Sequence, residues 1–153
     1  MLLKRIHANR RPAATLVETA AVIVIALLIM FGIFEYGRFV MTKQILENAA
    51  REGARWAVVH NNGTTAQVQD AVDQKLGAGR QQLSGYVKTS SITVYAADSN
   101  GNAVAGKNWN DAGFGENVAV QITGTYKPAL PNLLFMNSSF TISAKSVMAS
   151  ESN

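Results

Sequence analysis

The arrangement of apolar and polar residues begins with a long uncharged run. No residue from Thr19 to Phe34 is charged, and extending the run back to Ala13 adds a single charge, Glu18. A helix of about 22 residues is about 33 Å long, which is enough to cross a hydrocarbon core of about 30 Å. Because the segment is apolar on all sides rather than along one stripe, it favours a membrane-spanning helix over a buried helix of a soluble core.

The helical pattern continues past the apolar run. Residues 35–59 contain no proline, and their apolar and small residues recur every three or four positions, at Tyr36, Phe39, Val40, Leu46, Ala49, Ala50, Gly53, Ala54, Ala57 and Val58. This spacing predicts one continuous helix of about 46 residues, half in lipid and half outside. Its small residues allow another element to approach closely. We expect that element to be the chain's own sheet, and a partner subunit is the alternative.

The rest of the chain predicts a small α+β domain. Residues 60–63 (HNNG) can end the long helix in a left-handed conformation, and residues 66–76 carry the period of a second helix. Alternation of apolar and polar residues predicts strands around residues 86–97, 118–126 and 140–144. We therefore expect a sheet of three or four antiparallel strands, with one face covered by the helices.

Three connecting segments bear on function. Residues 98–102 (DSNGN) space oxygen-bearing side chains as calcium loops do, but they lack the glycine placement and closing Glu of an EF-hand, so a hairpin turn at Asn100 and Gly101 is the simpler interpretation. Trp109 and Phe114 lie in a glycine-rich loop, where they either cover the core or offer an aromatic contact surface. The apolar residues 133–136 are expected to plug the domain rather than to meet a partner.

Charge indicates orientation rather than a ligand. The formal net charge is +4, and Lys4, Arg5, Arg10 and Arg11 all precede the apolar run. By the positive-inside rule, this cluster holds the amino terminus in the cytoplasm and places the rest of the chain outside. A cleaved secretory signal peptide has a similar start, but its apolar core is usually only about 7 to 15 residues long. Pro12 disfavours helix at the residue before it, so the helix is predicted to begin near Ala13.

The sequence offers no motif for catalysis. It has no cysteine, which excludes disulfides and thiolate chemistry, and its two histidines, His7 and His60, form no paired zinc motif. No nucleophile elbow and no glycine-rich phosphate loop is present. We therefore predict a protein that is not an enzyme and has no cofactor, no metal site and no nucleic-acid partner.

Glu18 is the unusual residue of the apolar helix. A carboxylate costs about 2.5 to 3.5 kcal/mol at the centre of a bilayer, and less near the interface, so it usually has a partner or a function. If the chain were cut after Ala13, the new amino group of Ala14 would be a positive charge close to Glu18, on the same helix or on a neighbouring one. Each charge lowers the cost of burying the other, which makes the pair a self-assembly device.

Three motifs around this helix resemble a known family. RRPAATLVETA at residues 10–20, FEYGR at 34–38 and NAAREGARWAV at 48–58 are similar to the TadE-like proteins, prepilin-like components of the tight-adherence (Tad/Flp) secretion and pilus machinery. In that family a basic leader precedes a small residue, normally Gly, after which a prepilin peptidase cuts, and Glu is the fifth residue of the mature chain.

The family pattern can be placed on this chain residue by residue. Arg10 and Arg11 correspond to the basic leader, Ala13 to the residue before the cut, Ala14 to the first mature residue and Glu18 to the acidic residue. Ala13 replaces the usual Gly, and Thr19 replaces the aromatic residue that usually follows the Glu. The second Glu-Tyr pair, at residues 35 and 36, lies at the far membrane face and has Met30 where the Gly would be, so we reject it as a cut site.

The resemblance implies a minor pilin-like component, or pseudopilin, that acts in pilus assembly, initiation or at the tip. The expected organisation is a cleavable leader at 1–13, a transmembrane helix at 14–35, its extramembrane continuation at 36–59 and an extracytoplasmic α+β domain at 60–153. The implied location is the bacterial cytoplasmic (inner) membrane, and the implied partners are membrane lipid, a prepilin peptidase and other tight-adherence pilins and pseudopilins. The alternative is a single-pass anchored binding or adhesin domain that keeps its leader.

Overall fold

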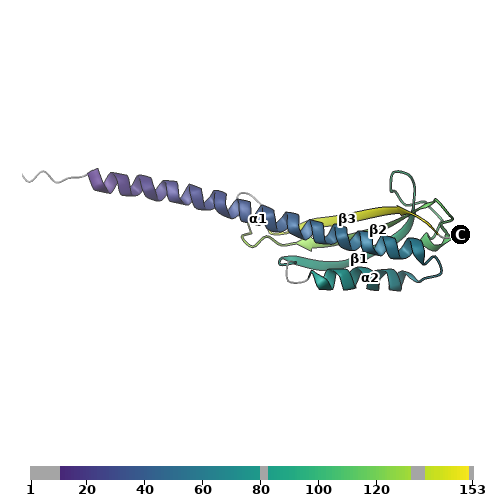
Figure 1. The fold of residues 1–153 in the computed structure, drawn as a ribbon. Coiled ribbons are helices and arrows are strands. Elements are labelled where there is room, and N and C mark those ends of the chain that lie inside the picture. Colours follow the sequence, from purple (N-terminus) through teal and green to yellow (C-terminus); the bar gives the residue numbers. More distant parts are fainter. Residues whose placement is uncertain (1–10, 80–82, 132–136, 152–153) are drawn as a thin grey trace, which may run out of the picture.

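One long helix carries a small α+β domain on its second half (Figure 1). The computed structural model describes residues 11–79, 83–131 and 137–151. Its elements, in chain order, are α1 (Arg11–Val59), α2 (Thr65–Ala78), β1 (Tyr86–Ala97), the 3-10 helix η1 (Trp109–Asp111), β2 (Asn117–Tyr126) and β3 (Phe140–Ala149). The first half of α1 projects away from the other described elements (Figure 1). The predicted α+β class is confirmed.

Helix α1 is 49 residues long and ends at Val59. Arg11, the first residue that the structure describes, is already helical, ahead of the predicted start near Ala13. Pro12 is compatible with a position near the start of a helix, because the first N–H groups of a helix have no acceptor within it and the fixed φ of proline suits a helix. The predicted left-handed cap is wrong for Gly63, whose φ is not positive. Gly63 instead makes room for a ring: a Cβ there would lie 2.5 Å from Cη2 of Trp56.

The sheet has three antiparallel strands in the order β1-β2-β3. Val94, Val120 and Ser146 stand in line across it, as do Tyr86, Tyr126 and Phe140 nearer the projecting half of α1. Side chains alternate between the two faces, as the sequence pattern predicted. The face toward the helices buries Ile92, Val118, Val120, Ile122, Ile142 and Ala144.

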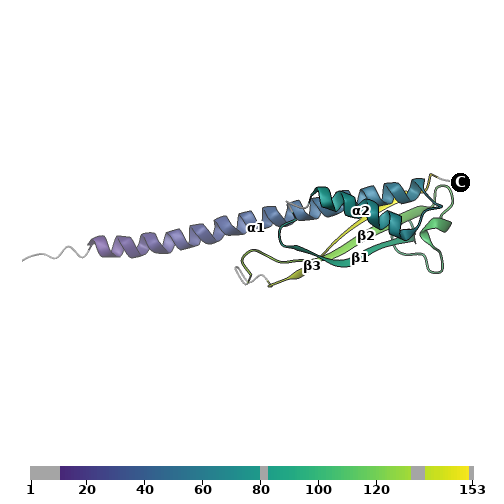
Figure 2. The same cartoon turned by 90° about the horizontal axis from the view of Figure 1, so that it is seen from below.

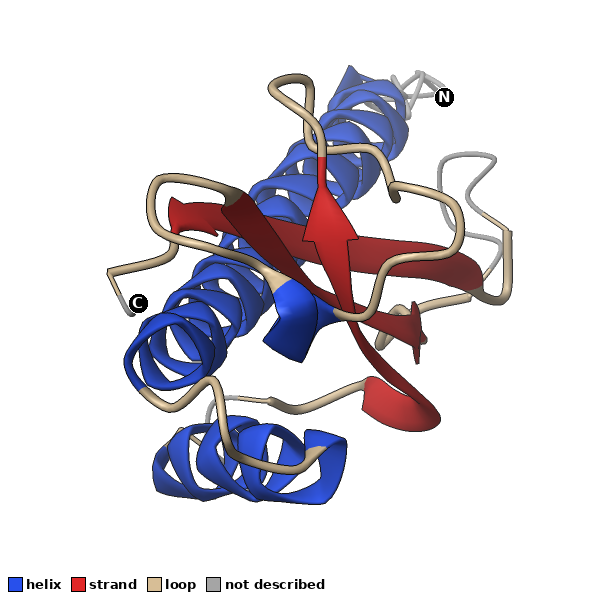
Figure 3. Cartoon of the chain, turned by 90° about the vertical axis from the view of Figure 1, so that its right-hand side faces the viewer, coloured by secondary structure: helices blue, strands red, loops and turns tan. Residues whose placement is uncertain are grey.

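Both helices cover that one face (Figure 2 and Figure 3). Helix α1 contributes the fully buried Leu46, Ala49, Ala50 and Ala54, and α2 contributes Val68 and Val72. The elements approach closely at Gly53, where a Cβ would lie 2.4 Å from Cγ2 of Val72 and 3.3 Å from Cγ1 of Val120. The small residues of α1 therefore pack against the chain's own helix and sheet, which was the preferred interpretation.

The connecting segments divide between core and surface. Asp98 accepts hydrogen bonds from the backbone N–H groups of Asn100 and Asn102, at 2.9 and 2.8 Å, in a tight turn with Gly101 at a φ of 78°. These donors hold the pKa of Asp98 below its ordinary value, the backbone of Asn102 contributing most. The turn that was preferred over a calcium loop is thus present, and Nζ of Lys145 lies 2.9 Å from the Gly101 carbonyl. The Lys145 ammonium group therefore already binds this carbonyl oxygen.

The two aromatic residues of the next loop behave differently from each other. Trp109 is buried in the core, and its indole N–H donates to the Thr65 hydroxyl at 3.1 Å. Phe114 is 74% exposed. The apolar residues 133–136, expected to plug the domain, lie outside the described residues.

Candidate functional site

The projecting half of α1 is apolar and uncovered. An 18-residue window within Ala14–Val59 has a mean hydropathy of 2.6, and none of it is buried against the chain. Large apolar side chains such as Leu16, Ile25 and Ile33 are exposed around the whole helix. Such a surface is unfavourable in water. Among the described residues, α1 is the one helix that is long and apolar enough to cross a bilayer. It fits a single-pass membrane anchor.

The residues expected to act in processing and assembly lie at the start of this helix. Ala13 is within its first turns, and Ala14 and Glu18 are both exposed. Four positions separate Ala14 from Glu18, which places them one above the other on the same helix face. A new amino group at Ala14 would therefore lie on the Glu18 side of the helix.

A polar cluster that the sequence did not reveal marks the other end of the apolar run. The Tyr126 hydroxyl donates to Oε1 of Glu35 at 2.6 Å, and Nε of Arg38 donates to the Tyr126 hydroxyl at 3.0 Å. A third contact closes the triangle, because Nη2 of Arg38 lies 2.8 Å from the same Glu35 oxygen. Glu35 and Arg38 are on α1, while Tyr126 ends β2. The cluster therefore ties the helix to the sheet at the point where the helix stops being apolar.

The loop that follows β2 joins the same cluster. The backbone N–H of Ala129 donates to Oε2 of Glu35 at 3.1 Å, and Nη2 of Arg38 donates to the Lys127 carbonyl at 3.1 Å. Both carboxylate oxygens of Glu35 thereby accept hydrogen bonds from residues that are far away in the sequence. Hydrogen bonds to charged groups contribute about 1.5 to 3 kcal/mol each, so the cluster fixes this loop against the helix.

An aromatic group surrounds the tyrosine. Tyr126 is fully buried, with Phe39 edge-on at 5.5 Å and Phe140 at 5.3 Å between ring centroids. The Arg38 guanidinium also lies 5.4 Å from the ring centroid of Tyr126. Burial, together with the hydrogen bond that the hydroxyl donates to Glu35, raises the pKa of Tyr126 to about 12. The tyrosine is therefore a neutral donor throughout the physiological range.

Sequence reasoning gave Glu35 no role beyond rejecting it as a cut site, and it did not single out Arg38. A signal was present, since a Glu and an Arg at positions i and i+3 immediately after an apolar run can reach each other on one helix face. Their third partner could not be found in the same way. Tyr126 is 91 residues from Glu35.

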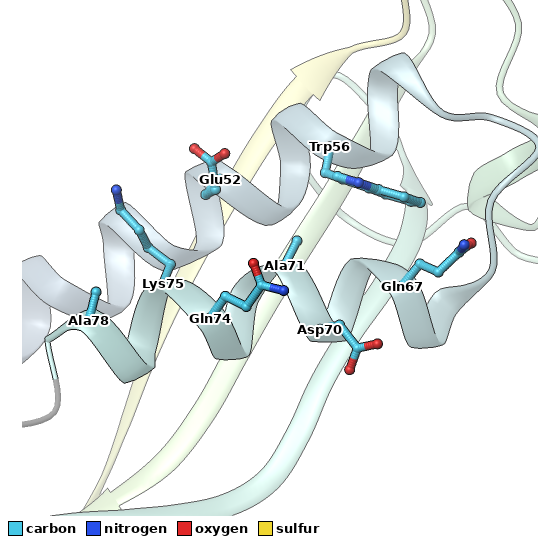
Figure 4. Close-up of a pocket in the computed structure, with 8 residues that line it drawn as sticks. All are labelled: Glu52, Trp56, Gln67, Asp70, Ala71, Gln74, Lys75 and Ala78. Atoms are coloured by element: carbon cyan, nitrogen blue, oxygen red, sulfur yellow. The ribbon is translucent and has the colours of Figure 1, made fainter.

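The clefts of the α+β domain have mixed polar and apolar linings. A groove of about 550 Å³ runs between the two helices and is lined by Glu52, Trp56, Gln67, Asp70, Ala71, Gln74, Lys75 and Ala78 (Figure 4). The described residues place no group of three metal-ligating side chains together.

Comparison with known proteins supports the sequence resemblance at the helix. Residues 13–55 match the family model described as TadE-like protein. No curated protein and no solved structure matches the chain. The matched segment contains Glu18, Glu35 and Arg38, and it runs from the projecting half of α1 into the half that packs on the sheet. The predicted resemblance to TadE-like proteins is confirmed over this segment.

Proposed function

We propose that this chain is a minor pilin-like component, or pseudopilin, of a tight-adherence pilus or secretion apparatus. The observation that carries the proposal is the TadE-like match over residues 13–55 on a helix that is apolar and uncovered in one half and packed on a domain in the other. A helix of this kind can rest in a bilayer before assembly and pack beside other helices after it. The cytoplasmic membrane of a bacterium is the proposed location.

The proposed orientation follows from charge. The basic residues before the helix face the cytoplasm, so residues 36–153 lie on the outer side of the membrane. In this arrangement residues 1–13 are a leader that a prepilin peptidase removes, and residues 60–153 are the part presented to partners. The proposed partners are membrane lipid, that peptidase and other tight-adherence pilins and pseudopilins.

Glu18 has the central role in the proposed assembly. Its carboxylate, at about the level of the first turn of the mature helix, is costly to leave unpaired in hydrocarbon. A neighbouring subunit's new amino terminus removes that cost by pairing with it, which favours lateral association in one register. Large apolar side chains on all sides of the helix then pack against the neighbours.

The experiment that tests this function compares Glu18→Gln with the wild type in a strain that lacks the native gene, scored for surface pili. Both proteins should insert into the membrane at equal levels, because Gln is no harder to insert than Glu, but the variant should assemble fewer pili. Glu52→Gln is the matched control, since Glu52 is a partly exposed carboxylate on the packed half of α1, 3.7 Å from the Arg55 guanidinium. Normal pili in the Glu18→Gln strain would contradict the assembly role.

A further inference from the structure

The loop after β2 lies beside the end of the apolar half of α1. Residues 127–131 lead from β2 along α1 toward its projecting half (Figure 1 and Figure 2). The bonds from Ala129 to Glu35 and from Arg38 to Lys127 fix this position. The lengthwise position of the loop on the helix is therefore set by the polar cluster.

The length of the apolar run determines how deep this loop lies relative to a bilayer. Residues 14–34 of a helix extend for about 31 Å, which matches a hydrocarbon core of about 30 Å. Glu35, the next residue, then lies at the boundary between hydrocarbon and headgroups. A loop whose backbone donates to the Glu35 carboxylate lies at the same depth, or slightly above it. This step rests on the membrane anchoring in the proposed function.

The side chains at this depth suit a lipid interface. Leu130 is 41% exposed and Tyr36 is 69% exposed, although both are apolar or aromatic. Lys127 is exposed as well. Tyrosine is enriched at the headgroup level of membrane proteins, and interfacial lysines act as anchors at the same level. Tyr36 and Lys127 thus lie at the headgroup depth, where these residue types are favoured.

We propose that residues 127–131 form a membrane-contact surface of the outer domain. Leu130 enters the upper edge of the hydrocarbon, and Lys127 faces the phosphates of anionic phospholipids. The surface gives the domain a second contact with the bilayer besides the helix, and the Glu35 cluster couples the two. The domain is therefore held in one orientation on the membrane instead of swinging about the end of the helix.

The absence of cysteine in the sequence makes the test direct, because a single introduced cysteine can carry a spin label. The full chain with Leu130→Cys is labelled and reconstituted into vesicles of phosphatidylethanolamine and phosphatidylglycerol. Power saturation then compares the accessibility of the label to oxygen, which concentrates in lipid, and to a water-soluble nickel chelate. Val104→Cys is the matched control, since Val104 is 40% exposed and lies in a loop beyond the opposite end of β1.

A label at Ile25 separates this inference from the anchoring on which it rests, because Ile25 is in the middle of the apolar run. We expect the labels at Ile25 and Leu130 to favour oxygen and the label at Val104 to favour the nickel chelate severalfold. The label at Leu130 should also become more water-accessible when Lys127→Gln is added or when the vesicles contain only phosphatidylcholine.

Three other outcomes would overturn the proposal. If Ile25 is in lipid while Leu130 is as water-accessible as Val104, the contact surface is wrong and the anchor stands. If Ile25 is in water, both the anchor and the contact surface fail. If the label at Leu130 is shielded from both reagents only at high protein-to-lipid ratio, a second copy of the chain covers this surface in place of lipid.

Discussion

The Tyr126 hydroxyl donates a 2.6 Å hydrogen bond to the Glu35 carboxylate, and this bond joins the last residue of β2 to the first residue after the apolar run of α1. The sheet is thereby fixed at one depth along the helix. If α1 is drawn from the membrane during assembly, the outer domain must move with it as one body. The cluster around this bond thus links the apolar half of α1 to the α+β domain.

Removing the hydroxyl should weaken this link. Tyr126→Phe leaves one oxygen of Glu35 and Nε of Arg38 without that partner, so we expect a loss of about 1 to 3 kcal/mol in the free energy of unfolding. Urea unfolding of the full chain in detergent, followed by the fluorescence of Trp56 and Trp109, measures the change. Tyr95→Phe is the control, because the Tyr95 hydroxyl makes only longer bonds, of 3.3 and 3.4 Å. A loss equal to that of the control would show that the Glu35 contact contributes little.

The raised pKa of Tyr126 predicts that the stability of the fold falls at alkaline pH. Tyr126 loses its proton near pH 10 in the unfolded chain and near pH 12 in the folded one. The raised pKa therefore contributes stability that is complete below pH 10 and is lost as pH rises toward 12. Tyrosinate absorbance should show one group that titrates last in the wild type, and this step should be missing in Tyr126→Phe. An unchanged last step in the variant would assign the raised pKa to another tyrosine.

Replacing Gly53 or Gly77 with alanine should change stability in opposite directions, because only Gly53 lies where the two helices pack closely. Gly53→Ala places a methyl group 2.4 Å from Cγ2 of the buried Val72, so we expect a loss of about 1 to 3 kcal/mol. Gly77→Ala lies within α2 with nothing within 4 Å of the new Cβ, so it should stabilise by about 0.5 to 1 kcal/mol. Thermal unfolding of the two variants measures both. A neutral Gly53→Ala would mean that α2 can move away from α1 at little cost.

The elements of this fold were predictable because their signals are local. The strand at residues 86–97 and an antiparallel sheet, expected with three or four strands and found with three, follow from periodicity read over a dozen residues, and the end of α1 at Val59 follows from the HNNG segment after it. Arg11 was predicted to be non-helical but is helical, because the rule for the residue before proline was given more weight than the tolerance of a helix's first turn. Both rules concern a single turn, and sequence alone does not rank them.

The polar cluster was not predictable for a different reason. Glu35 and Arg38 are visible as a pair on one helix face, but their partners Tyr126 and Ala129 come together with them only when the sheet packs on the helix. The two aromatic residues of the loop at 106–115 show the same limit. Trp109 has Thr65 within reach of its N–H and is buried, whereas Phe114 is exposed, and nothing in the loop sequence separates them.

The proposed processing of this chain as a pilin-like subunit is tested most directly by the intact mass of the membrane-inserted protein. The chain is expressed with and without a tight-adherence prepilin peptidase and measured by mass spectrometry. We predict that residues 1–13 are lost only when the peptidase is present, leaving Ala14 as the first residue. A chain that keeps its leader in both samples would contradict the account and leave a permanently anchored outer domain, and a cut after Phe34 or beyond would identify the apolar helix as a signal peptide.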